Sequence, residues 1–195
     1  MAKELPPNLP YSGLSSVGMV ARWQPVHLGH QAVLHALCRS AAYVKIGIGS
    51  ANVSNYRSPF TVEEVSEMLH LVLEGWENYT LIPIPDLNDG PHWREMVTGL
   101  FDPLDIFFTD NPYVASLMQS VYDVRRPVHL LGKEEQIAVS GTLVRKAMAH
   151  GADWASMLPE AVAAYIQANR LDTRFREFFG LQTLALETII SKRSN

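Results

Sequence analysis

Short apolar segments alternate with segments of helical periodicity along most of this 195-residue chain. The apolar segments, which we expect to be strands, are residues 16–21, 43–49, 79–84, 105–109 and 128–131. The helical patterns lie at residues 28–40, 61–73, 92–100 and 114–121, and Thr61-x-x-Glu64 predicts a capping box at the start of the second pattern. Strands that alternate with helices predict a parallel, doubly wound sheet. We therefore expect an α/β fold with a five-stranded parallel sheet and a helical C-terminal region.

The first strand-to-helix junction carries the sequence RWQPVHLGH at residues 22–30. His27 and His30 are three residues apart at the start of the expected helix, so both can face one bound group. Unpaired N–H groups and the helix dipole make such a junction an anion site, and Gly29 lets a phosphate approach the backbone. The junction therefore predicts a triphosphate held for attack at its α-phosphorus. Surface histidines or zinc ligands are the alternative, but the single cysteine, Cys38, and the scattered remaining histidines disfavour zinc.

A second polar pattern, SGTLVRK, follows at residues 140–146. Ser140 is a residue type favoured at the N-cap, and Thr142 and Arg145 lie one turn apart on the helix expected after it. Hydroxyls and helix N–H groups can hold the β- and γ-phosphates, while Arg145 can neutralise charge on a leaving pyrophosphate. Taken alone, the pattern also fits an ordinary capped helix with a solvated arginine. Its occurrence together with the histidine pair favours phosphate binding.

The expected topology gathers these segments at one edge of the sheet. In doubly wound sheets, ligands bind beyond the carboxyl ends of the strands. The junction at residues 22–30, the loop at 50–59 and the turns at 86–90 and 109–111 would all lie there. This convergence is the main support at the level of the fold for a ligand site.

Composition narrows the class of protein. The net charge of −4 and the isoelectric point near 6.0 argue against a general nucleic-acid surface, which would be basic. No apolar run approaches the ~20 residues that span a bilayer, and residues 1–7 lack the apolar core of a signal peptide. We therefore expect a cytoplasmic protein with no nucleic-acid or membrane partner.

The patterns R-W-Q-P-x-H-x-G-H and S-x-T-x-x-R together resemble the nucleotidylyltransferase superfamily, and most of all its archaeal-type nicotinamide-nucleotide adenylyltransferases. Further matching stretches are residues 46–51, 59–61, 83–88, Trp93, 108–111 and 151–154. The resemblance runs from about Val17 to Ile166 and implies a Rossmann-like nucleotidylyltransferase fold. We expect residues 1–170 to form this domain and residues 171–195 to form a helical extension.

The resemblance implies an enzyme that joins AMP from ATP to nicotinamide mononucleotide, giving NAD and pyrophosphate. The attacking phosphate is already an anion, so catalysis needs positioning and charge neutralisation instead of a protein nucleophile. By resemblance, the catalytic residues are His27, His30, Arg22 and Arg145, and the ATP-binding residues are Gln24, Gly29, Ser140 and Thr142. Mg²⁺ would bridge phosphate oxygens and be held by ATP more than by protein carboxylates, so no protein metal ligand is expected.

The resemblance also suggests residues for the acceptor nucleotide. Trp93 corresponds to the aromatic residue on which the nicotinamide ring stacks, although a tryptophan packed in the core is an equal alternative. Asp86 and Asn88 could contact substrate or simply form a turn. Asn111 is a further candidate, and Arg57 is a candidate on the loop before residue 59.

Two departures from the family pattern concern the acceptor. Where relatives often read F-T-x-G-E-R, this chain reads FTVEEV, so Val65 replaces an arginine that contacts substrate phosphate. Arg57 could supply the missing charge. Asp110 replaces a common glycine, and its carboxylate could repel nicotinate or accept a hydrogen bond from a carboxamide. The alternatives are therefore another phosphorylated acceptor, such as nicotinate mononucleotide or phosphopantetheine, and a nucleotide-sensing protein without turnover.

The tail at residues 171–195 has a helical pattern. Its expected apolar anchors are Phe175, Phe178, Phe179, Leu181, Leu184, Leu186, Ile189 and Ile190. Such residues must be buried, either on their own domain or on a neighbouring subunit. Because archaeal-type relatives form homo-oligomers, we expect a homo-oligomer, with burial on the same domain as the alternative.

Overall fold

The computed structural model describes residues 13–186 of the chain, which form two compact units. Within the described part, unit 1 comprises residues 13–21, 32–52 and 75–137. Unit 2 comprises residues 22–31, 53–74 and 138–186. The division falls inside helix α1 (Leu28–Ser40).

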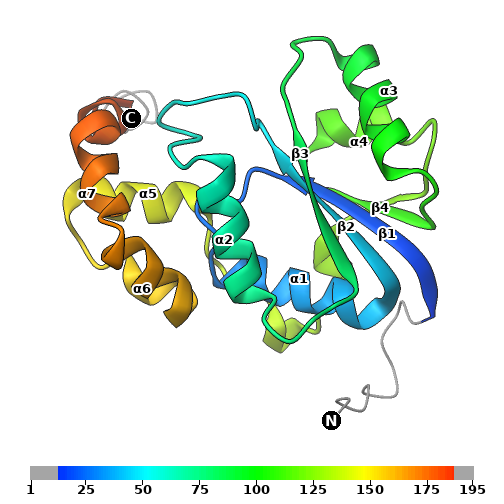
Figure 1. Cartoon of the computed structure of the whole chain (residues 1–195), viewed down its shortest axis with the longest axis horizontal. Helices are drawn as coiled ribbons and strands as arrows, with labels where there is room; N and C mark the ends of the chain where they lie inside the picture. Colours follow the sequence, from blue (N-terminus) through cyan, green and yellow to red (C-terminus); the bar gives the residue numbers. More distant parts are fainter. Residues whose placement is uncertain (1–12, 187–195) are drawn as a thin grey trace. The chain divides into compact units, whose positions relative to one another are not determined.

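Unit 1 contains a five-stranded parallel sheet in the order β3-β2-β1-β4-β5 (Figure 1). The strands are β1 (Leu14–Ala21), β2 (Ala41–Gly49), β3 (Tyr79–Ile84), β4 (Ile106–Phe108) and β5 (Val124–Arg125). The chain proceeds outward from β1 to β3 and then returns to place β4 on the free side of β1. This confirms the predicted doubly wound parallel fold and makes the carboxyl ends of β1 and β4 its switch point.

Helices α3 (Gly90–Phe101) and α4 (Pro112–Met118) pack against one another in unit 1 (Figure 1). The core cluster beneath them consists of Ile84, Val97, Phe101, Phe107, Met118 and Tyr122. The ring of Phe101 approaches β1 so closely that a Cβ atom at Gly18 would lie 2.6 Å from a ring carbon. A glycine is therefore required there for the helix to pack on the strand.

Apart from the turn at residues 22–27 and the loop at residues 53–61, unit 2 is mainly helical. Its helices are the start of α1, α2 (Val62–Val72), α5 (Gly141–His150), α6 (Glu160–Ala168), α7 (Leu171–Phe175) and the π-helical segment η4 (Arg176–Gly180). Thr61 and Glu64 form the predicted capping box of α2, and Ser140 is the predicted N-cap of α5. Helix α2 packs against α6, while α7 packs against α5 and α6.

Short 3-10 helices complete the described structure: η1 (Pro127–Leu130), η2 (Lys133–Glu135) and η3 (Ala155–Met157). The first of them corrects the sequence analysis, which placed the fifth strand at residues 128–131. The strand is Val124–Arg125 instead, paired with Phe107 and Phe108 of β4. Pro127 has no N–H to donate and a fixed φ, so the apolar residues after it turn and do not join the sheet.

The described part of the tail, residues 171–186, is helical as expected, and it belongs to unit 2. Its apolar residues are divided between core and surface: Phe175 is 1% exposed, whereas Phe178 and Leu181 are 72% and 85% exposed. Ile189 and Ile190, which were expected to be apolar anchors, lie outside the described residues. None of the helices within residues 13–186 is both long and apolar enough to cross a lipid bilayer.

Candidate active site

The two histidines of unit 2 form the N-terminal cap of helix α1. His27 directly precedes the helix, and its carbonyl accepts the first helical bond from the N–H of Gln31. The N–H of His30 donates to Nδ1 of His27 over 3.3 Å, and the N–H of His27 donates to Nδ1 of His30 over 3.4 Å. This reciprocal arrangement is a capping box in which imidazoles replace the usual hydroxyl and carboxylate.

The capping bonds determine where each imidazole carries its proton. Because both Nδ1 atoms accept from backbone N–H groups, a neutral ring holds its proton on Nε2. The two rings are stacked, with centroids 3.6 Å apart and planes inclined by 17°. The edge of Trp23, which has a positive φ of 57°, lies against His30 with a centroid distance of 4.8 Å. The pair is therefore held rigidly and has Nε2–H donors of the kind that a phosphate oxygen accepts.

Both histidines are neutral at neutral pH. Burial, followed by the positive charge of Arg145, lowers the pKa of His27 to about 4. Burial and the neighbouring His27 lower the pKa of His30 well below its ordinary value, against a smaller opposite effect of the Pro25 carbonyl. By helix geometry the N–H groups of Leu28 and Gly29 have no intrahelical acceptor. The start of α1 therefore offers hydrogen-bond donors that carry no full charge, so their burial does not cost the desolvation of an ion.

Arg145 supplies the permanent charge. Its guanidinium is buried, with the residue only 8% exposed, and donates from Nη1 to the carbonyl of Gln24 over 2.5 Å and from Nη2 to Thr142 Oγ1 over 3.4 Å. Gly141, the first residue of α5, lies directly against the same carbonyl, which a Cβ atom would approach to 2.8 Å. Helix α5 therefore begins against the turn that leads into α1, and Arg145 is not the solvated side chain of the alternative interpretation.

Two more arginines of unit 2 contribute to this positive region. Burial, then the charges of Arg22 and Arg57, lowers the pKa of Arg145 to about 10, so Arg145 remains charged at neutral pH. Arg22 directly follows β1, and Arg57 is exposed on the 53–61 loop. Among the described residues, no carboxylate forms an ion pair with Arg57 or Arg145. Because Arg57 and Arg145 have no carboxylate partner among the described residues, this region attracts an anion of high charge.

Gln24 connects this region to the 53–61 loop, a role that the sequence analysis missed. Its Nε2 donates to the carbonyl of Phe60 over 2.9 Å, and its Oε1 accepts from the N–H of Phe60 over 2.9 Å. Gln24 is only 6% exposed, and its own carbonyl accepts from Arg145. Gln24 was expected to bind ATP, but in the structure its amide holds the backbone of the loop.

The other predicted ATP-binding residues lie nearer to solvent. Ser140 Oγ accepts from the N–H of Leu143 over 3.3 Å, which satisfies the N-cap and leaves the hydroxyl proton available to an acceptor. Ser140 and Thr142 are exposed, and Gly29 is half-buried in the first turn of α1. Their contact with ATP stays a prediction.

The acceptor candidates lie in unit 1, where the loops after the strands are joined in pairs. Asn52, after β2, donates from Nδ2 to the carbonyl of Asp86 and accepts from its N–H, over 3.0 and 2.8 Å. Asp86 and Asn88 are exposed, and Asn88 has a positive φ of 54°, as a turn residue does. Trp93 is half-buried in the first turns of α3, packed against the core cluster of this unit.

Asn111 and Asp110 follow β4 in the same unit. Asn111 is the N-cap of α4, and its Oδ1 accepts from the N–H groups of Tyr113 and Val114. Asp110 Oδ1 accepts from Nε of Arg126, which follows β5, over 2.8 Å. Both side chains of this ion pair are more than half exposed. Asp110 is therefore neutralised by a partner that the sequence analysis did not foresee.

Val65, which replaces the family arginine, is fully buried in α2. It has no part in a binding surface, so the only arginine charge of the 53–61 loop and α2 is that of Arg57. Within residues 13–186, no three His, Cys, Asp or Glu side chains are close enough to one another to hold a metal ion.

Comparisons with known proteins identify the family to which this chain belongs. The model of the cytidylyltransferase-like family matches residues 19–147. The nicotinamide-nucleotide adenylyltransferase of Methanothrix thermoacetophila is 35% identical over 150 residues, which cover 75% of this chain and 86% of that protein. The enzyme of the same name from Picrophilus torridus is 38% identical over 152 residues, covering 76% of this chain and 88% of that protein.

A solved structure shares the fold. The bifunctional NMN adenylyltransferase/ADP ribose pyrophosphatase from Francisella tularensis, complexed with AMP and a manganese ion, has a TM-score of 0.63 at 20% identity. The match covers 93% of this chain and 55% of that longer chain.

Proposed function

Because the chain belongs to the cytidylyltransferase-like family, and within it to the nicotinamide-nucleotide adenylyltransferases, we propose that it joins AMP from ATP to nicotinamide mononucleotide. The products are NAD and pyrophosphate. The family membership confirms the resemblance seen in the two sequence motifs. The observation that carries the proposal is the pair of neutral histidines capping α1, beside the buried Arg145.

The proposed reaction requires no protein nucleophile. An oxygen of the 5′-phosphate of nicotinamide mononucleotide forms a bond to the α-phosphorus of ATP, and the bond from that phosphorus to the bridging oxygen of the β-phosphate breaks. Pyrophosphate departs with the electron pair of that bond. The protein has to align the two anions and offset their charge, and prepositioned donors in a site shielded from water do this without reorganising.

The geometry suggests a role for each group of unit 2. The Nε2–H donors of His27 and His30 would bind α-phosphate oxygens as charge grows there. Arg145, held by Gln24 and Thr142, would bind the departing pyrophosphate. Ser140 and Thr142 would hold the outer phosphates, while Arg22 and Arg57 would add positive charge. Neutral histidines suit the α-phosphate because their N–H groups donate hydrogen bonds to it without a full positive charge that would bind the negatively charged product tightly.

For the acceptor, we propose that Trp93 stacks on the nicotinamide ring and that Asp86, Asn88 and Asn111 bind the rest of the nucleotide. The half-buried position of Trp93 leaves part of the indole available for stacking. Asp110, neutralised by Arg126, would accept a hydrogen bond from a carboxamide better than it would tolerate a carboxylate.

The divalent metal that the reaction needs would enter bound to ATP. The manganese ion in the Francisella tularensis structure makes a divalent metal reasonable for this fold, and we propose Mg²⁺. Phosphate oxygens and water are the ligands that Mg²⁺ prefers, so ATP itself would supply most of its ligands. We further propose that the protein is a cytoplasmic homo-oligomer, and the apolar composition of the tail supports the oligomer.

The test is pyrophosphate release from ATP and Mg²⁺ in the presence of nicotinamide mononucleotide, nicotinate mononucleotide or phosphopantetheine. His30→Ala should lower the rate by about 100- to 1,000-fold, the usual loss when a donor to developing charge is removed. His30→Gln is the matched variant, because glutamine is the ordinary residue at this capping-box position and keeps the bond to His27. His129→Ala, at an exposed histidine of η1, is the control.

Release with nicotinamide mononucleotide, matched by NAD and lost in both His30 variants, would support the proposal. Release only with another acceptor would keep the chemistry and overturn the substrate. ATP binding without release from any acceptor would favour a nucleotide-sensing protein, for which Val65 and Asp110 are the motivating departures.

A further inference from the structure

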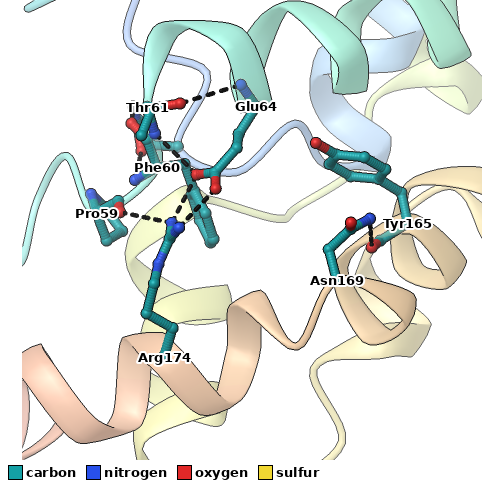
Figure 2. Close-up of polar contacts among 8 residues, drawn as sticks. Pro59, Phe60, Thr61, Glu64, Tyr165, Asn169 and Arg174 are labelled. Atoms are coloured by element: carbon teal, nitrogen blue, oxygen red, sulfur yellow. Dashed lines mark hydrogen bonds and ion pairs between the residues drawn. The ribbon is translucent and has the colours of Figure 1, made fainter.

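Arg174 of α7 forms a two-pronged ion pair with Glu64 at the start of α2 (Figure 2). Nη1 lies 2.6 Å from Oε1, and Nη2 lies 2.6 Å from Oε2. Nη2 also donates to the carbonyl of Pro59 over 3.3 Å. The Glu64 side chain is only 15% exposed and that of Arg174 is 37% exposed. Parallel bonds of this kind fix the orientation of both side chains as well as their distance.

Glu64 is itself held by the backbone that enters α2. Its Oε2 accepts from the N–H of Thr61 over 2.9 Å, and its own N–H donates to Thr61 Oγ1 over 3.3 Å. Arg174 therefore binds a carboxylate that is already fixed, next to the carbonyl of Pro59. Through these contacts a residue of the C-terminal region is joined to residues 59–64, which lie 110 or more positions earlier in the chain.

The same segment is the downstream end of the 53–61 loop. Gln24 holds it from the other side through both backbone groups of Phe60. Upstream, Asn55 closes a tight turn by accepting from the N–H groups of Arg57 and Ser58. Arg57 thus projects from a compact turn whose position depends on the anchors at Pro59 and Phe60.

Arg57 acts on the candidate active site through its charge. It is one of the two arginines whose charges lower the pKa of Arg145. Val65, at the family position of a phosphate-binding arginine, is buried and uncharged. In this chain the cation offered by this part of unit 2 is therefore Arg57, whose side chain is free of ion pairs among the described residues.

We propose that Arg174 is a positioning residue of the active site: by clamping Glu64 and Pro59, it holds the 53–61 loop where Arg57 meets a substrate phosphate. The proposal rests on the adenylyl transfer proposed above for the identity of that phosphate. Helix α7 of the C-terminal region would then contribute to substrate binding through Arg174. A purely structural role for the ion pair would instead lower stability and leave substrate binding unchanged in the folded fraction.

The test compares Arg174→Met with Arg176→Met in the full-length protein. Arg176 is the matched control, because among the described residues its side chain bonds only to Asp172 and Thr173, which lie four and three residues before it in the same stretch of helix. Arg57→Ala first identifies which Michaelis constant, that for ATP or that for nicotinamide mononucleotide, depends on the loop charge. Arg174→Met should raise the same constant by about 10-fold with a smaller change in kcat, whereas Arg176→Met should leave it unchanged.

A double variant separates positioning from general damage. If Arg174 acts through Arg57, the Arg57→Ala/Arg174→Met protein should be no worse than Arg57→Ala alone, because the second change removes support from a side chain already lost. If the increase in the Michaelis constant of the double variant equals the product of the two single increases, the two residues act independently and the proposal is overturned. If Arg174→Met does not fold, Arg174→Lys is the alternative variant. Lysine keeps the positive charge but cannot form the two parallel bonds to Glu64, so it should raise the same Michaelis constant by a smaller factor.

A second readout does not depend on turnover. Trypsin cleaves after arginine, so cleavage between Arg57 and Ser58, followed by mass spectrometry, reports how firmly the loop is held. Arg174→Met should be cut there faster than the unmodified protein, and Arg176→Met at the unmodified rate. Equal cleavage in all three proteins would overturn the proposal. Faster cleavage in a protein that transfers AMP to no acceptor would show that the anchor exists and that the proposed function has failed.

Discussion

The buried residues of unit 2 that we propose act on phosphate differ from the exposed residues of unit 1 that we propose bind the acceptor in how firmly the chain holds them. His27, Gln24 and Arg145 are each less than a tenth exposed, and each is bonded to backbone atoms. In unit 1, Asp86, Asn88 and Asn111 are exposed, and the Asp110–Arg126 ion pair is more than half exposed.

The difference corresponds to two kinds of recognition. Charge that develops during bond breaking is offset best by groups that need not move, and burial with backbone bonds provides this. A flat pyridinium ring and a ribose can be bound by stacking and by hydrogen bonds near the surface, where each contact contributes less. Substitutions of the buried residues in unit 2 should therefore have larger effects on activity or stability than substitutions of the exposed residues in unit 1.

After the His30 variants, the largest effect is expected at Arg145. Arg145→Met should lower kcat/KM by about 100-fold, because the variant loses the cation that offsets pyrophosphate charge. Arg145→Lys keeps the charge but cannot bond Gln24 and Thr142 with the same fixed fork, so it should recover only part of the loss. Steady-state kinetics of both variants check this. Full activity in Arg145→Met would show that the buried guanidinium only supports the fold.

The next effect concerns the pH dependence of stability. The pKa of His27 is about 4 in the folded chain, because burial and then Arg145 disfavour the imidazolium, and it is ~6.5 in an unfolded chain. The unfolded state therefore binds more protons between these values. Stability should be complete above about pH 6.5 and should fall as the pH drops towards about 4, by about 3 kcal/mol or less.

His27→Asn isolates this contribution. Asparagine is a good N-cap and does not titrate, so the variant should lose less stability between about pH 7 and about pH 4.5 than the unmodified protein. Denaturant unfolding at both pH values measures the difference. The exposed His129→Asn variant should keep the full pH dependence. An unchanged slope in His27→Asn would contradict the neutral, buried state of the pair.

A smaller effect is expected from Trp93 in unit 1. Trp93→Ala should raise the Michaelis constant for nicotinamide mononucleotide by about 10-fold, the amount of one lost aromatic stacking contact, and should leave that for ATP unchanged. Trp93→Phe should retain most of the affinity. Equal effects on both substrates would favour the alternative that Trp93 acts through the core cluster against which it packs.

The smallest effect is expected at the exposed ion pair of unit 1. Asp110→Asn should change the preference for nicotinamide over nicotinate mononucleotide by less than about 10-fold, because solvent screens charges at such a surface. Arg126→Ala, which leaves the Asp110 carboxylate without its partner, should increase the preference for the carboxamide. Competition between the two nucleotides measures both changes. A change in preference larger than the about 10-fold effect expected for Trp93→Ala would contradict the small contribution that we assign to this exposed ion pair.

Local patterns in the sequence predicted much of this structure. Alternating apolar and amphipathic segments gave the sheet, and the capping residues Thr61, Glu64 and Ser140 were identified because a cap is a contact between neighbours in the chain. The fifth strand was misplaced because the apolar run after Pro127 looks like a strand, although proline prevents it from pairing.

Contacts between distant residues could not be read from the sequence. Gln24 meets Phe60 across 36 positions and Arg145 across 121, and Arg174 meets Glu64 across 110. The motifs indicated that Gln24 and Arg145 matter, yet only the fold shows that Gln24 holds the loop and that Arg145 is buried against the carbonyl of Gln24. Arg126 and Arg174 lie outside every motif, so no local signal could have identified their roles.

The central claim is that unit 2 directs attack on the α-phosphate of ATP. It is tested most directly with ATP radiolabelled at that phosphate, incubated with nicotinamide mononucleotide and Mg²⁺, in the unmodified protein and in His30→Gln. The account predicts that the label appears in NAD, that the released pyrophosphate is unlabelled, and that the variant nearly abolishes both products. Label in pyrophosphate or in free phosphate, or equal transfer by the variant, would contradict it.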